Sequence, residues 1–241
     1  MALDLSDQVA LVTGAGRGIG AAIAGRLSEA GASLVLAART EAEIEAVAQE
    51  IRHAGRNALA VPCDVSDEAS VTSLFEQIRS RHESLEILVN NAGVGVFGAV
   101  QDFDVGDFDR VMGVNARGCF LCCREGSRMM LAHDSGTIIN ISSVVGFKGY
   151  PLQAAYTASK HAIMGLTRSL AAEVQGAGIR VSAVLPGGVD TDLVRSARPD
   201  LDPSELMHPD DVADAVMYLL SLSDRAAVDE IYIRRRSGTA H

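Results

Sequence analysis

Short apolar runs rich in β-branched residues alternate along the chain with segments whose apolar residues recur every three or four positions. A short run that is apolar at nearly every position is typical of a strand buried on both faces, as in a parallel sheet. The predicted strands are residues 9–13, 33–38, 58–62, 85–90, 137–142, 179–185 and 228–233. Helical spacing predicts helices over 19–30, 44–53, 71–78, 105–133 and 152–175, the last including the periodic stretch 161–174.

Strands that alternate with helices through short links form a doubly wound sheet with right-handed crossovers. We therefore predict an α/β fold: a Rossmann-type parallel sheet of seven strands with helices on both faces. A chain of 241 residues without repeats or linkers suits a single domain over 1–241. Its cofactor half would cover roughly residues 1–135 and its catalytic and substrate half roughly residues 136–241.

Composition and charge narrow the classes of function. Hydrophobic residues make up 48% of the chain, and the net charge of −10 argues against a nucleic-acid-binding face. The basic cluster Arg234–Arg236 is interpreted as a solvated tail or a subunit contact. No apolar stretch approaches the ~20 residues that a membrane span needs. Residues 1–8 carry two Asp and no basic residue, unlike a signal peptide, so a cytoplasmic protein is expected.

Four cysteines in a chain of this length do not form a disulfide framework. Cys119 and Cys122 have C-x-x-C spacing with Cys123 adjacent, but they fall inside a predicted helix rather than at its amino terminus. A reactive thiolate needs such a terminus or a neighbouring cation. We expect these cysteines to pack in the core or an interface, and we expect no metal site because no His lies at ligand spacing.

A glycine-rich turn follows the first predicted strand. Gly14, Gly18 and Gly20 have G-x-x-x-G-x-G spacing, with Arg17 and Ile19 between them, and a predicted helix follows. Glycines allow a tight turn and let a pyrophosphate approach the helix amino terminus, whose N–H groups and dipole favour anions. The position of this turn, between a first strand and a helix, indicates a dinucleotide-binding site.

Several further motifs occur in order along nearly the whole chain. They are Gly14, Gly18 and Gly20, then Asn90-Asn91-Ala92-Gly93, Asn115, Ser143, the stretch Tyr156–Lys160, and Pro186-Gly187. Together they resemble the short-chain dehydrogenase/reductase family. The resemblance implies a hydride transfer between a nicotinamide cofactor and a carbonyl or alcohol, with Ser143, Tyr156, Lys160 and Asn115 as catalytic residues.

Tyr156 and Lys160 are four residues apart on a predicted helix, so their side chains face the same way. A cation beside a tyrosine stabilises its phenolate, so Lys160 is expected to lower the pKa of Tyr156. Tyr156 would donate its proton in reduction and accept it in oxidation. By resemblance, Lys160 also binds the nicotinamide ribose, Ser143 orients the substrate oxygen, and Asn115 sits at a helix distortion and holds a water of a proton relay.

The resemblance also implies the rest of the cofactor site. These residues follow predicted strands, at the edge of the sheet where such folds bind ligands. They are Asp64, Val65, Asn91, Ala92, Gly93, Pro186, Gly187, Val189 and Thr191.

NADP rather than NAD is predicted from the charges near the adenosine ribose. NAD-specific proteins place an acid at the end of the second strand, and here that position is Ala38. Arg39 follows it, and Arg17 lies in the glycine turn; a guanidinium can make paired hydrogen bonds to a 2′-phosphate.

The predicted substrate is a small or medium, fairly apolar carbonyl or alcohol. Apolar residues expected around the cleft are Val94, Val96, Phe97, Phe147, Tyr150 and Leu193. A 3-oxoacyl-carrier-protein reductase is an alternative, disfavoured because two positions expected to be basic near the cleft are Asp134 and Ala177. A non-catalytic NADP-binding protein is the other alternative. Compared with many family members, the segment between Thr191 and Asp210 is short, and the chain lacks a glycine-rich ending.

A homodimer or homotetramer is predicted from the helices over 105–133 and 152–175. Both carry apolar residues on more than one face, so they should be buried between the sheet and a partner subunit. Examples are Phe120, Leu121, Ile163, Met164 and Leu166.

Overall fold

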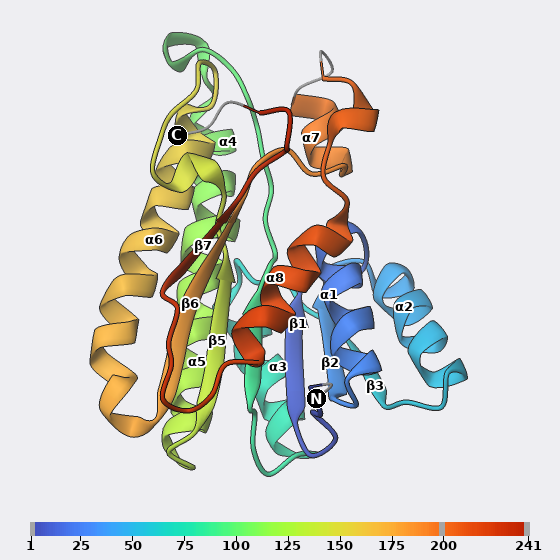
Figure 1. The fold of residues 1–241 in the computed structure, drawn as a ribbon. Coiled ribbons are helices and arrows are strands. Elements are labelled where there is room, and N and C mark those ends of the chain that lie inside the picture. The colour runs from blue at the N-terminus through green and yellow to red at the C-terminus, as the bar shows by residue number, and fades with distance from the viewer. Residues whose placement is uncertain (1–2, 198–200, 239–241) are drawn as a thin grey trace.

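The computed structural model describes residues 3–197 and 201–238 (Figure 1). Seven parallel strands form one sheet in the order β3-β2-β1-β4-β5-β6-β7. The strands are β1 (Val9–Thr13), β2 (Ser33–Ala38), β3 (Ala58–Pro62), β4 (Ile87–Asn90), β5 (Gly136–Ile141), β6 (Ile179–Pro186) and β7 (Glu230–Ile233). The predicted doubly wound α/β fold is therefore confirmed.

Helices connect the strands. They are α1 (Gly18–Glu29), α2 (Glu41–His53), α3 (Glu68–Arg79), α4 (Val105–Met112), α5 (Gly118–Leu131), α6 (Ala154–Val174), α7 (Asp192–Ala197) and α8 (Pro209–Leu220). Short 3₁₀ turns lie at Val100–Asp102, Val144–Gly146, Gln175–Ala177 and Pro203–Glu205. No helix in residues 3–197 and 201–238 is long and apolar enough to cross a membrane.

Each strand feeds two cores because successive side chains point to opposite faces of the sheet. In β1, Ala10 and Val12 belong to one buried cluster and Leu11 belongs to the other. Helices α1, α2 and α8 cover the first face, and α3, α5 and α6 cover the second (Figure 1). This two-sided burial explains why the strands read as continuous apolar runs.

Element boundaries differ from the predictions in a few places. The strand predicted over 85–90 begins at Ile87, and the one predicted over 228–233 begins at Glu230. Leu85 is buried and Val228 is packed against the core, so both read as strand residues although they precede the ladder. The helix predicted over 105–133 is divided by a π-helical turn at Gly113–Arg117.

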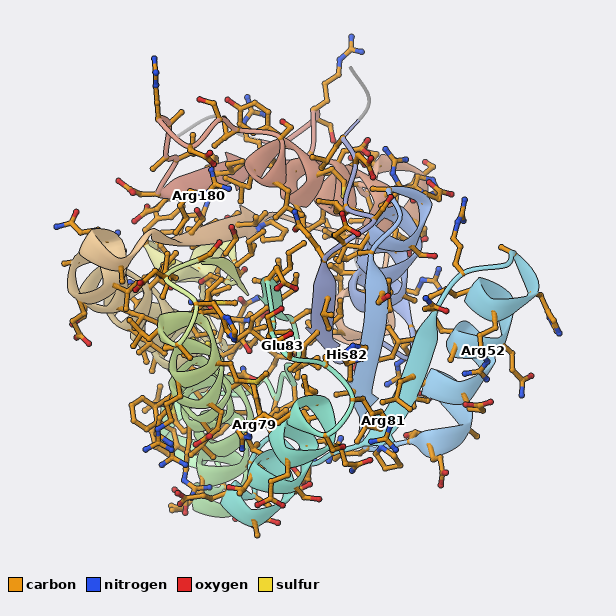
Figure 2. The ribbon with its side chains drawn as sticks, turned by 90° about the horizontal axis from the view of Figure 1, so that it is seen from below. Arg52, Arg79, Arg81, His82, Glu83 and Arg180 are labelled. Atoms are coloured by element: carbon orange, nitrogen blue, oxygen red, sulfur yellow. The ribbon has the colours of Figure 1, made fainter. Side chains whose placement is uncertain are left out.

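The amino and carboxyl ends of the parallel strands, called here the amino and carboxyl edges of the sheet, differ in whether they form a cleft for a ligand. At the amino edge, seen in Figure 2, Arg52, Arg81 and Arg180 donate to backbone carbonyls of Ala58, Gln77 and Leu222. At the carboxyl edge the turns after the strands surround a large cleft. The chain order reverses between β1 and β4, which is where such sheets bind ligands.

Candidate active site

The cleft at the carboxyl edge has a volume of about 930 Å³. Loops after all seven strands contribute to its walls. Its size is near the upper end of the range of ligand pockets in proteins. Every predicted site residue except Gly20 and Asn115 lines it.

The glycine turn forms the floor of one end of the cleft. Gly14 and Gly18 adopt positive φ angles of 65° and 55°, a conformation that strongly favours glycine. A Cβ on Gly20 would lie 2.2 Å from the carbonyl oxygen of Gly14. The backbone therefore packs too closely for a side chain here, and the amino terminus of α1 faces the cleft. These features fit the pyrophosphate of a dinucleotide.

Asn91 and Thr13 hold this turn against the end of β4. The Asn91 side-chain amide donates to the carbonyls of Thr13, at 3.0 Å, and Gly14, at 3.1 Å. The Thr13 hydroxyl accepts from the backbone N–H groups of Asn91 and Ala92. Thr13 was missed by the sequence analysis; its one signal was a hydroxyl residue ending an apolar strand.

Tyr156, Ser143 and Lys160 meet at the other end of the cleft. A side-chain hydrogen bond joins Tyr156 to Ser143. The Lys160 amine lies 5.6 Å from the centre of the Tyr156 ring and donates to the carbonyl of Ile141 at 2.9 Å. Ser142 is buried, and its hydroxyl donates to the carbonyl of Lys160. Of the two adjacent serines, Ser143 is the one that contacts the tyrosine.

The electrostatics differ from the expectation for this pair. Burial raises the pKa of Tyr156 to about 12, and the hydrogen bond with Ser143 acts in the opposite direction. Burial also lowers the pKa of Lys160 to about 8. Burial therefore sets the net direction in the chain by itself, and the stabilisation of the phenolate by Lys160 stays a prediction. Desolvation disfavours both charged forms, which sequence spacing alone does not reveal.

Asn115 is fully buried in the π-helical turn. Its side-chain amide pairs with both backbone groups of Val94, at 2.8 and 2.9 Å, and donates to the Ser159 hydroxyl at 3.0 Å. The expected helix distortion is present at this residue. Through these contacts Asn115 links the cleft wall at Val94 to Ser159 of helix α6.

The adenosine end carries the two predicted cations. Arg39 is exposed, and its charge adds to hydrogen bonds from Ser66 in lowering the pKa of Asp64. Arg17 makes ion pairs with Glu43, at 3.2 Å, and Asp192, at 3.7 Å. Glu43 was missed by the sequence analysis. Its signal was a carboxylate in the first turn of the helix that follows Arg39.

Four of the predicted apolar residues, Val94, Phe97, Tyr150 and Leu193, line the cleft, whereas Val96 and Phe147 do not. The ring of Phe147 instead packs edge-on against Tyr232, with ring centres 5.2 Å apart.

The interpretation of the Arg234–Arg236 run as a solvated tail is wrong for two of its residues, whereas a subunit contact stays a prediction. Arg234 and Arg235 line the cleft and are half-buried, whereas Arg236 is exposed. β7 pairs with β6 and delivers the following residues to the carboxyl edge.

All four cysteines are buried and unpaired. Cys119, Cys122 and Cys123 lie along α5, and burial raises the pKa of the Cys122 thiol well above its usual value. Within the described ranges, no group of three His, Cys, Asp or Glu side chains could hold a metal ion.

Asp134 and Ala177 precede β5 and β6, at the edge opposite the cleft. Within one protomer these two positions therefore lie away from the cleft, and not near it as expected.

Comparison with known proteins supports the reading of the cleft. Residues 8–202 match the sequence model of the family described as short chain dehydrogenase. A 3beta-hydroxysteroid dehydrogenase of Mediterraneibacter gnavus is 39% identical over 196 residues, covering 81% of this chain and 71% of the relative. A cis-4-hydroxycyclohexanecarboxylate dehydrogenase of Sinomonas cyclohexanicum is 39% identical over 225 residues, covering 90% of each chain.

The crystal structure of a metagenomic short-chain oxidoreductase in complex with NADP is similar throughout. It superposes with a TM-score of 0.85 at 38% identity, covering 96% of this chain and 98% of the other. The named relatives act on hydroxyl groups, and the family binds a nicotinamide cofactor. The chain belongs to the short-chain dehydrogenase/reductase family and is a nicotinamide-dependent oxidoreductase of alcohol and carbonyl groups.

Proposed function

We propose that the protein is an NADP(H)-dependent ketone or aldehyde reductase and alcohol dehydrogenase, with Tyr156 as its acid and base. The observation that carries this proposal is the hydrogen bond between Ser143 and Tyr156 inside the cleft. Two hydroxyls held together at one point can both reach a single substrate oxygen. A bound nicotinamide would supply or accept the hydride at the adjacent carbon.

Tyr156 acts as the proton donor in the direction of reduction. With a pKa of about 12, its phenol remains protonated through neutral pH. The neutral phenol passes its proton to the carbonyl oxygen as that oxygen gains negative charge. The Ser143 hydroxyl donates a hydrogen bond to the same oxygen and keeps it within reach of Tyr156. Oxidation requires Tyr156 to accept a proton as the phenolate. Burial disfavours that charged form, and the positive charge of Lys160 would stabilise it.

Lys160 and Asn115 complete the proposed proton path. The amine of Lys160 shares the buried region behind Tyr156 with the Asn115 amide; a Cβ on Gly93 would lie 3.7 Å from the Lys160 amine and 3.4 Å from the Asn115 oxygen. Lys160 would bind the nicotinamide ribose and stabilise charge on Tyr156. Asn115 would support a water on the route from Lys160 to solvent, while its side chain holds Val94 in place.

The cofactor would lie along the residues from the glycine turn to the substrate end. Gly14, Gly18 and Ile19 would bind the pyrophosphate, and Asp64 and Val65 would contact the adenine. The nicotinamide half would contact Asn91, Ala92, Gly93, Pro186, Gly187, Val189 and Thr191, all of which line the cleft. Arg17 and Arg39 would hold the 2′-phosphate and make NADP the preferred cofactor; Ala38, at the end of β2, carries no charge that would repel it.

The proposed assembly is a homodimer or a homotetramer built from it. Of the residues that suggested it, Leu121, Ile163 and Met164 are buried within the protomer, and only Phe120 is largely exposed, at 49%. Other large apolar side chains on the same helices, Val105, Phe108 and Leu131, are also exposed. They extend an apolar surface along α4 and α5 that a second subunit would cover.

The test of the function is the Tyr156→Phe variant. Removing one hydroxyl deletes the proton donor and leaves the ring packed against Phe97, with ring centres 5.8 Å apart. Turnover should fall at least about 100-fold while NADPH binding persists, because general acid–base groups contribute about 10²–10⁴-fold. Turnover is followed by nicotinamide absorbance across ketones, aldehydes, oxo esters and hydroxy acids. Near-normal turnover in the variant would remove Tyr156 from the mechanism.

A further inference from the structure

Besides Lys160, three cationic side chains from the segments after β5 and β7 line the cleft: Lys148, Arg234 and Arg235. Arg234 follows β7 directly, where Ile233 pairs with Pro186 of β6. A Cβ on Gly187 would lie 3.3 Å from the Cα of Arg234, and the Ser143 hydroxyl lies 3.4 Å from the carbonyl of Pro186. The pairing of β7 with β6 thus places Arg234 close to Pro186, which contacts Ser143. Arg234 and Tyr156 are 78 positions apart along the chain.

The acidic residues of the cleft are already engaged elsewhere. Glu43 and Asp192 pair with Arg17, and Asp190 pairs with Arg195 at 2.7 Å. Asp64 accepts hydrogen bonds from the backbone and hydroxyl of Ser66. Each of these carboxylates has a partner that compensates its charge or occupies its oxygens. Within residues 3–197 and 201–238, none of these carboxylates forms an ion pair with Arg234 or Arg235.

Arg234 keeps a guanidinium edge and a charge without a carboxylate. One terminal nitrogen, Nη1, donates to the backbone carbonyls of Arg235, at 3.1 Å, and Gly238, at 2.7 Å. Within residues 3–197 and 201–238, no carboxylate forms an ion pair with Arg234, and no hydrogen bond uses its Nε or Nη2. Arg235 differs because it pairs with Glu205 at 3.7 Å. The two carbonyls hold Arg234 in place but do not neutralise it.

The segment that carries Arg234 is held at the carboxyl edge of the sheet by contacts with Glu205. After β7 the chain turns along the same edge as α7 (Figure 1), and Arg235 and Ser237 both contact Glu205. Lys148 adds positive charge nearby, with its amine 4.9 Å from the centre of the Tyr150 ring. A half-buried, positioned guanidinium whose free edge has two parallel N–H donors matches the geometry of a carboxylate.

We propose that the substrate is a hydroxy acid or oxo acid whose carboxylate binds the Nε–Nη2 edge of Arg234. This inference rests on the proposed function, in which Tyr156 and Ser143 bind the reacting oxygen of the substrate. It identifies the chemical group at the other end of that substrate. Apolar side chains, among them Val94, Phe97 and Leu193, line the same cleft. The substrate therefore has an apolar body with the reacting carbonyl at one end and the anionic group at the other.

The experiment compares oxo acids of graded length with their methyl esters, using NADPH and the intact protein. The ester keeps the carbonyl and the body but carries no charge. The wild-type protein should prefer the acid of the right length in kcat/KM. Arg234→Met should lower kcat/KM for that acid by about ten- to hundredfold, mainly through KM, and leave the ester nearly unchanged. Arg234→Lys should retain part of the preference, since it keeps the charge and loses the paired geometry.

Arg236→Met is the matched control, because it removes the same charge from the adjacent, exposed position outside the cleft. It should leave the ratio of acid to ester efficiencies unchanged. If Arg234→Met does not fold, Arg234→Lys decides by the same ratio of acid to ester efficiencies, because the amount of folded protein does not change that ratio.

Equal wild-type efficiency on acids and esters would overturn the proposal. An equal loss of kcat/KM for acids and esters in Arg234→Met would also overturn it, because Arg234 would then only hold the C-terminal segment in place. A rise confined to the KM for NADPH would overturn it too, because Arg234 would then bind the cofactor. If the wild type reduces no carbonyl compound and oxidises no alcohol, it is the proposed function that fails. Turnover of the esters separates the two failures.

Discussion

At the scale of single residues, the proposed preference for NADP depends on four charged side chains at the adenosine end of the cleft. Arg17 is 69% exposed and lies between Glu43 and Asp192, so a 2′-phosphate has to compete with two carboxylates for it. Arg39 forms no ion pair with a carboxylate in the described part of the chain and can respond fully to the phosphate. The preference for NADP should therefore depend more on Arg39 than on Arg17.

We expect Glu43→Gln to raise the preference for NADPH over NADH. Exposed ion pairs contribute about 0.2–1 kcal/mol, so releasing Arg17 from Glu43 should raise the ratio of kcat/KM values about one-and-a-half- to fivefold. Ala38→Asp combined with Arg39→Ile should reverse the preference, because an acid repels the phosphate. Glu41→Gln, on the same helix and outside the cleft, is the control. A parent protein that prefers NADH would contradict the assignment of both arginines.

At the scale of elements, Gly20 and Gly25 of helix α1 have opposite environments. A Cβ on Gly20 would lie 2.2 Å from the carbonyl oxygen of Gly14 and 2.5 Å from the Asn91 amide, within the turn that packs against β4. A Cβ on Gly25 would meet nothing within 4 Å. One glycine is required by packing, and the other is a helix-interior residue that alanine can replace.

Gly20→Ala should therefore destabilise the protein by about 1–3 kcal/mol and weaken cofactor binding, because the clash is with backbone. Gly25→Ala should stabilise it by roughly 0.4–1 kcal/mol, since alanine lowers the entropy of the unfolded chain and favours the helix. Denaturant unfolding and an NADPH titration measure both effects. A Gly20→Ala protein as stable as the parent, with unchanged affinity, would show that the turn is not closely packed.

At the scale of the whole molecule, the exposed apolar residues of α4 and α5 predict self-association. Analytical ultracentrifugation at micromolar concentration should show at least twice the 25.3 kDa mass of the chain. Phe120→Glu should shift the distribution toward the monomer, because a charge in the interface would lose its water without gaining a partner. A parent protein that sediments as a monomer would refute the assembly.

Stability should also depend on pH through Lys160. Its pKa is about 8 in the folded chain and 10.5 without burial, so between these values the unfolded chain binds more protons. Stability therefore rises with pH across this window, by up to about 3 kcal/mol. Above about pH 10 Tyr156 acts in the opposite sense, since its folded pKa is the higher one.

Urea unfolding without cofactor at about pH 7.5 and about pH 9.5 would measure the effect of Lys160. In Lys160→Met most of the rise should disappear, and in Lys148→Met, which removes a lysine that is not fully buried, the rise should remain. The same rise in all three proteins would mean that another group causes it.

The sequence by itself determined the fold and most of the candidate site. Continuous apolar runs and helical spacing are local patterns, and they predicted all seven strands and the glycine turn between β1 and α1. Tyr156 and Lys160 were recognised because a separation of four residues on a helix already fixes their common direction. Order along the chain then placed the other motifs at one edge of the sheet, because parallel strands end there together.

Tertiary structure alone decided which charges meet and which are deprived of water. Glu43 reaches Arg17 only because α2 returns against the glycine turn, and Arg234 enters the cleft only because β7 pairs with β6. Burial, rather than the neighbouring lysine, sets the direction of the pKa of Tyr156. Spacing along a chain reports directions within one element, whereas ion pairing and desolvation depend on segments that are distant in sequence and are brought together only in the fold.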